Sequence, residues 1–107
     1  MKNVLRNKKY LVTYNNKILS KLENLADKSK LLRSRVCIHL NNKSKTHEMI
    51  IALKKGSYIQ PHIHPNGKSE AYNVIKGKMI VNVFNKSGKK IKIIKMGELR
   101  SGLNFYY

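Results

Sequence analysis

The sequence predicts a mainly β fold, an antiparallel sandwich or barrel with one helix near its N-terminal end. Several short segments alternate apolar and polar residues and are separated by turns rich in Gly, Asn and Pro, as in antiparallel sheets. Only residues 16–28 carry apolar residues at helical spacing. A chain of 107 residues is long enough for one domain at most. Within it we expect a strand and helix in residues 1–30 to pack on a β domain in residues 31–107.

The first elements follow a basic lead segment. Residues 10–14 are apolar enough for a short strand, and residues 16–28 form the one convincing helix. Asn15 or Asn16 can cap this helix, because a short polar side chain satisfies its free N–H groups. Its apolar residues form a single stripe, which we interpret as packing surface: Ile18, Leu19, Leu22, Leu25 and Ala26.

The rest of the chain reads as a series of strands. Alternation or apolar content predicts strands at residues 33–40, 47–53, 57–62, 71–76, 79–84 and 89–95. The intervening segments are polar or rich in Gly, Asn and Pro, which predicts loops and turns, among them residues 41–46 and 85–88.

Charge is the most unusual feature of the composition. The chain has 23 Lys and Arg against 5 Asp and Glu, a formal net charge of +18. Such a balance can indicate an anionic partner: nucleic acid, a phosphorylated substrate or a membrane surface. Because the basic residues are spread along the chain without a nucleic-acid-binding motif, we favour a solvated surface and expect no specific nucleic-acid partner.

The cysteine content and the hydropathy of the chain indicate in which compartment we expect the protein. Cys37 is the only cysteine, so no internal disulfide can form and a reducing compartment fits. We interpret Cys37 as a small buried hydrophobe. No apolar stretch approaches the roughly 20 residues of a membrane span, and the first residues lack a signal-peptide core. We therefore expect a cytoplasmic protein without a membrane span.

The segment 56–77 holds the residues with the clearest chemistry. Alternate residues of a strand share a face, so an extended His62-Ile63-His64 directs both imidazoles to one side. Glu70 follows a turn-forming stretch and could return to the same point from the next strand. Imidazole nitrogen and carboxylate oxygen are common metal ligands. The pattern predicts a metal site at His62, His64 and Glu70.

These residues, spaced with Gly56 and Gly77, resemble the first motif of the cupins. The gap between His64 and Glu70 is five residues, longer than the usual three or four. The stretch HEMIIALKKGSYIQPHIHPNGKSE is similar to the WbuC family of cupin-fold metalloproteins. The resemblance implies an antiparallel jelly-roll barrel and a role beside surface-polysaccharide (O-antigen, lipopolysaccharide) biosynthesis. It also implies a sugar or sugar-nucleotide ligand and leaves the reaction open.

The resemblance implies further strands and a third histidine beyond the last residue, Tyr107. We therefore expect a truncated chain whose barrel is incomplete at the C-terminus. An unpaired sheet edge invites pairing with another chain, so we expect a homodimer or poor solubility.

Two imidazoles and a carboxylate suit Fe, Mn, Ni or Zn as a divalent ion, and ligand identity does not choose among them. Gln60, Lys68 and Tyr72 flank these ligands and could contact a substrate, and the resemblance implies that His39 lines the pocket. His39 and His47 could substitute for a missing ligand, and Cys37 shares a predicted strand face with His39, although we favour structural roles for all three. Histidine or Tyr72 is left for proton transfer if the site is catalytic.

Three functions remain open at this stage. The first is a small metal-binding cupin of unknown reaction. The second is a non-catalytic cupin that binds a small molecule, and the third is a degenerate remnant. The sequence has no nucleophile elbow, paired-cysteine motif, P-loop or dinucleotide fingerprint, so those enzyme classes lack support. Whether the chain is an enzyme stays open.

Overall fold

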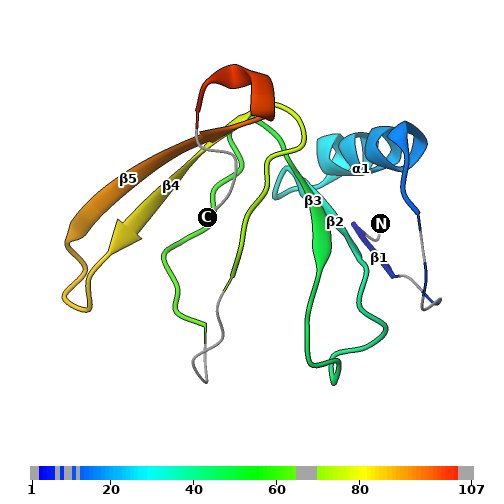
Figure 1. Cartoon of the computed structure of the whole chain (residues 1–107), viewed down its shortest axis with the longest axis horizontal. Helices are drawn as coiled ribbons and strands as arrows, with labels where there is room; N and C mark the ends of the chain where they lie inside the picture. The colour runs from blue at the N-terminus through cyan, green and yellow to red at the C-terminus, as the bar shows by residue number, and fades with distance from the viewer. Residues whose placement is uncertain (1–2, 7, 9–10, 12, 65–69, 104–107) are drawn as a thin grey trace. The chain divides into compact units, whose positions relative to one another are not determined.

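The computed structural model describes residues 3–6, 8, 11, 13–64 and 70–103, and its strands form two small sheets (Figure 1). The elements in chain order are β1 (Val4–Arg6), α1 (Asn16–Lys28), β2 (Arg33–Cys37), β3 (Met49–Leu53), β4 (Lys78–Phe84), β5 (Lys90–Gly97) and the 3-10 helix η2 (Leu99–Ser101). They divide into two compact units: unit 1 is Met1–Ile59 and unit 2 is Gln60–Tyr107. No helix in the described residues is long and apolar enough to cross a bilayer.

Helix α1 of unit 1 has the bounds that its sequence pattern predicts. The Asn15 side chain caps it by accepting a hydrogen bond from Lys17 N at 3.0 Å. Leu22 and Ala26 of the apolar stripe are buried, and the helix packs on β2 and β3. Ser34 Oγ, itself buried, donates to the Leu22 carbonyl at 2.5 Å, which ties the helix to the centre of the sheet.

The sheet of unit 1 has the order β1-β2-β3. Strands β2 and β3 are antiparallel, as predicted, with Arg35 opposite Ile51. Strand β1 instead runs parallel to β2, so the purely antiparallel prediction is wrong here. The helix between β1 and β2 makes this possible, because parallel neighbours need a long crossover.

The strand predicted at residues 10–14 is not found. Leu11, Thr13 and Tyr14 are irregular, while Tyr10 and Val12 lie outside the described residues. The first strand comes earlier, and Asn3 beside it donates through Nδ2 to the Arg33 carbonyl at 3.1 Å. The alternation of basic and apolar residues is too weak in this short lead segment to locate the strand.

Unit 2 contains the antiparallel hairpin β4–β5, as predicted, each strand within two residues of its expected bounds. The predicted turn is confirmed: Asn85 Oδ1 accepts hydrogen bonds from the backbone N–H groups of Ser87 and Lys89, and Gly88 adopts a positive φ of 86°. On one side of the hairpin the apolar residues are half-buried to buried, and the best-buried of them are Ile94 and Met96.

The predicted strands 57–62 and 71–76 are wrong. Residues 57–62 join no sheet, and in 71–76 only Asn73 forms an isolated bridge. Proline lacks an N–H to donate to a ladder, so Pro61 works against a paired strand there. With two sheets of three and two strands, the described residues form no closed barrel, and the cupin jelly roll is not confirmed. The coarser prediction, a mainly β fold with one helix, is confirmed.

Candidate functional site

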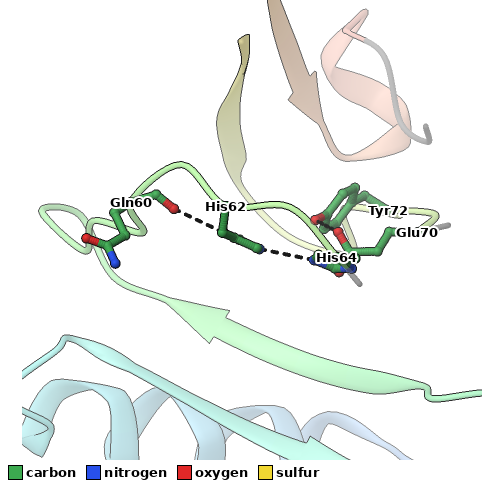
Figure 2. A network of polar contacts seen from close by, with 5 residues as sticks. All are labelled: Gln60, His62, His64, Glu70 and Tyr72. Atoms are coloured by element: carbon green, nitrogen blue, oxygen red, sulfur yellow. Dashed lines mark hydrogen bonds and ion pairs between the residues drawn. The ribbon is translucent and has the colours of Figure 1, made fainter. Parts of the chain in front are cut away.

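The two central histidines lie in an irregular stretch at the start of unit 2, where their rings face each other (Figure 2). His62 Nε2 is 3.0 Å from His64 Nε2, and the ring centroids are 5.0 Å apart. Ile63 between them is 85% exposed. The expected strand is absent, yet the i, i+2 spacing still places both imidazoles together.

Glu70 joins this pair from the other side of the segment 65–69. Its Oε1 lies 3.1 Å from His64 Nε2, and its Oε2 accepts a hydrogen bond from the Tyr72 hydroxyl. Figure 2 shows Glu70 and Tyr72 beside the His64 ring. The structure thus brings the three predicted ligands together, because His62 Nε2 and Glu70 Oε1 both lie next to His64 Nε2.

Hydrogen-bond donors are scarce at this cluster. His62 Nδ1 lies 3.0 Å from the Gln60 carbonyl, which can only accept, so this nitrogen carries the proton in the neutral ring. His62 Nε2 is then an acceptor. His64 Nε2 has a single proton to offer, and both His62 Nε2 and Glu70 Oε1 lie within its reach. Three atoms with lone pairs therefore share one proton.

The spacing of these atoms is also that of metal ligands. Nitrogen and oxygen ligands lie about 2.0–2.2 Å from a transition metal, so neighbouring ligands are roughly 3.0–3.5 Å apart. The His62–His64 and His64–Glu70 separations of 3.0 and 3.1 Å match this. The atoms contact one another directly, however, and the described residues contain no group of three or more His, Cys, Asp or Glu already arranged to hold an ion.

Tyr72 is part of the cluster through its hydroxyl. Burial, followed by the hydrogen bond to Glu70 and the negative charge of Glu70, together raise the pKa of Tyr72 to about 12. A phenol with this pKa keeps its proton at neutral pH. Tyr72 is therefore suited to donate to Glu70 and unsuited to act as the proton acceptor considered from the sequence.

The other candidate residues have different positions. Gln60 contributes its backbone carbonyl to His62, and its side chain makes no hydrogen bond to any other residue that the structure describes. Lys68 lies outside the described residues. Sequence reasoning treated Gln60 and Tyr72 as pocket residues and missed their hydrogen bonds. For Tyr72 a signal was present, since Glu70 and Tyr72 have the same i, i+2 spacing as the two histidines.

The remaining histidines form a second pair in unit 1. The rings of His39 and His47 are stacked, with centroids 4.1 Å apart and planes inclined by 6°. His39 Nδ1 accepts from the Glu48 N–H at 3.2 Å, and His47 Nε2 donates to the Asn42 carbonyl at 3.0 Å. Backbone groups thus occupy these nitrogens. Cys37, at the end of β2, is buried and free.

The chain matches the family described as Domain of unknown function (DUF6016) over residues 14–96. No curated protein and no solved structure is significantly similar to it.

This match overturns the resemblance to cupins and to the WbuC family. A few histidine, glutamate and glycine positions at loose spacing are a short pattern that unrelated chains can share, and the residues that the structure describes form no closed barrel. The sugar-nucleotide ligand, the polysaccharide role and the missing second motif depended on that resemblance and lose their basis. Because the match covers most of its length, including α1, both histidine pairs and nearly all of the hairpin, the chain belongs to the DUF6016 family.

Proposed function

We propose that this protein binds a divalent transition metal through His62 Nε2, His64 Nε2 and Glu70 Oε1. The observation that carries the proposal is the convergence of these atoms, with His64 Nε2 at 3.0 Å from one and 3.1 Å from the other. A cation would take the place of the proton that the three lone-pair atoms now share, and that proton would move to Nδ1 of His64, so that the ring stays neutral and binds through Nε2. Small side-chain rotations would open the space it needs, since His62 and Glu70 are exposed.

The partners around the three ligands support the proposal. Metal-binding histidines usually donate their second ring N–H to a carbonyl or carboxylate, and ligating carboxylates are hydrogen-bonded in turn. His62 makes the first kind of contact with Gln60, and Glu70 makes the second with Tyr72. These contacts hold His62 in the tautomer that a metal ligand requires and leave Oε1 as the carboxylate oxygen directed at His64 Nε2, where the ion would bind.

The site suits metal binding with open positions. Zn, Fe, Mn and Ni all accept two imidazoles and a carboxylate. The His64 and Glu70 side chains are 29% and 42% exposed, so water or a small oxygen ligand can reach an ion held between them. A metal bound there would supply Lewis-acid chemistry. Reversible metal binding is the function we propose.

The test measures Zn(II) and Co(II) binding to the purified chain by calorimetry, with metal content checked after dialysis. We expect one ion per chain, with affinity that rises with pH because the metal competes with a proton. His62→Ala and Glu70→Ala should each lower the affinity by more than a hundredfold, beyond the effect of losing an outer partner.

Two variants serve as controls. Gln60→Ala should bind normally, because only the backbone carbonyl of Gln60 contacts His62. His47→Ala removes an exposed histidine of the other pair and should also bind normally. Absence of binding to the unmodified chain, or binding that survives both ligand substitutions, would refute the proposal.

A further inference from the structure

One face of the β4–β5 ribbon carries exposed apolar and cationic side chains together. The register pairs Ile80 with Lys95, Asn82 with Ile93 and Phe84 with Lys90, and paired residues of an antiparallel ladder share a face. Lys78 begins the same row on β4. On this face Ile80 is 61% exposed and Ile93 53%. The opposite face holds the buried Ile94 and Met96, so these isoleucines are the hairpin's outward side.

A register shift near the turn extends this outward face. Val83 pairs with Lys92 and Phe84 with Lys90, which leaves Ile91 between them without a partner in the ladder. Ile91 is 59% exposed and Phe84 36%. The outward face therefore combines four apolar side chains with lysines and one asparagine.

The charge of the hairpin is of one sign. Residues 78–97 include six lysines and neither Asp nor Glu. The nearest carboxylate in sequence, Glu98, accepts a hydrogen bond from Gly77 N at the open end of the ribbon. A second copy of the same face would meet it with like charge, which disfavours self-association. The positive charge therefore favours an anionic partner on this face.

The apolar residues decide which anionic occupant fits. Protein surfaces that bind nucleic acid combine cationic side chains, which contact the phosphates, with aromatic rings that stack on the bases. Here the apolar residues are mainly isoleucines, which have no flat ring to stack on a base. Aliphatic side chains inserted between headgroups, with lysines reaching phosphates around them, are the arrangement by which surfaces bind anionic bilayers.

We infer that the outward face of the β4–β5 ribbon docks on an anionic phospholipid surface. Ile80, Ile91, Ile93 and Phe84 enter the headgroup region, and the lysines on the same face bind lipid phosphates. This surface is independent of the metal site.

The experiment is vesicle co-sedimentation of the full chain, using phosphatidylcholine alone or with a third of the lipid replaced by phosphatidylglycerol. We expect binding only to the anionic vesicles. Ile80→Ser with Ile93→Ser should weaken binding more than tenfold, because the inserted apolar area is lost. Lys78→Gln with Lys90→Gln should weaken it roughly twenty-fivefold, at about fivefold for each lysine.

Matched controls change the same residue types in unit 1. Leu11 and Leu31 are 88% and 55% exposed, and Leu11→Ser with Leu31→Ser should bind normally. Lys43→Gln with Lys45→Gln removes two exposed charges from a loop and should lower binding by less than twofold. Equal losses in the control and hairpin variants would mean general charge attraction and would overturn the proposal.

Fluorescence gives a second measurement that does not depend on weakened variants. The chain has no tryptophan, so Phe84→Trp introduces a single probe on the outward face. Its emission should shift to the blue on anionic vesicles, whereas a Tyr58→Trp control, at a site 73% exposed in unit 1, should not shift. An unshifted Phe84→Trp probe, or binding to single-stranded RNA that displaces the vesicles and ignores the isoleucine substitutions, would overturn the proposal.

Discussion

The two histidine pairs of this protein place the same side chain in different surroundings. In unit 1, His39 and His47 stack face to face at 4.1 Å, and His39 is only 8% exposed. In unit 2, His62 and His64 meet through their Nε2 atoms at 3.0 Å, in an exposed stretch beside a carboxylate.

The difference lies in the partners of the ring nitrogens. Around His39 and His47 the described contacts are with backbone groups: His39 Nδ1 faces both the N–H and the carbonyl of Glu48, and His47 Nε2 donates to the Asn42 carbonyl. Around His62 and His64 the lone pairs face one another with one proton between them. Histidine proximity alone therefore says little about metal binding, and the atoms that each nitrogen faces decide it.

The largest effect that this comparison predicts is on stability. His39→Ala should lower the free energy of unfolding by about 2–3 kcal/mol, because it leaves a cavity and removes the acceptor of the Glu48 N–H. His62→Ala should change it by less than about 0.5 kcal/mol, since His62 is exposed. Urea unfolding followed by circular dichroism measures both. Equal losses of unfolding free energy in the two variants would show that the pairs do not differ in their contribution to stability.

The next effect concerns the contact that orients Glu70. Tyr72→Phe should weaken Zn(II) binding by about 10–100-fold, or about 1.4–2.7 kcal/mol, because the carboxylate loses its hydrogen-bond donor. Calorimetry measures the affinity. Tyr58→Phe, at an exposed tyrosine whose described contact uses its backbone carbonyl, is the control and should bind normally. A Tyr72→Phe variant with unchanged affinity would show that this hydroxyl plays no part in the site.

A smaller effect separates the two members of the stacked pair. His47→Ala should cost about 0.5–1 kcal/mol of stability, since it removes a ring contact and one hydrogen bond to Asn42 at an exposed position. The same urea titration measures it. If His47→Ala cost as much as His39→Ala, the stack itself would be the main stabilising contact, and burial of His39 would not.

The smallest effect is a pH dependence at the candidate metal site. The pKa of Tyr72 in the folded chain, about 12, lies above its ordinary value of 10.0. The folded state therefore holds this proton more tightly, and the resulting stability is complete below pH 10 and is lost as pH rises through 12. The tyrosinate absorbance of the chain minus that of Tyr72→Phe should show one group titrating near pH 12. A difference titrating near pH 10 would contradict the buried hydrogen bond to Glu70.

Local pattern was enough to predict much of unit 1 and the hairpin. The apolar stripe and Asn15 define α1, and the Asn-x-Ser-Gly turn after β4 defines the β4–β5 connection, because these signals act within a few residues. The predicted strands 57–62 and 71–76 failed, since a strand exists only where a neighbour supplies its hydrogen bonds, and local sequence does not specify that neighbour.

The candidate site was predictable in its residues and not in its geometry. The spacing of His62 and His64 places both imidazoles on one side of any extended backbone, so their proximity did not need the expected strand. The role of Tyr72 as donor, and of the Gln60 carbonyl as the group that sets the tautomer of His62, could be seen only once the atoms were placed.

The sequence by itself determined the helix, the hairpin, the excess of positive charge and the residue types at the candidate site. Only the tertiary structure decided that β1 pairs in parallel with β2, that no barrel closes within the described residues, and which histidine nitrogens face backbone and which face each other. The reason is physical: helix periodicity and turn chemistry are local, whereas strand pairing and lone-pair direction depend on groups distant in the chain.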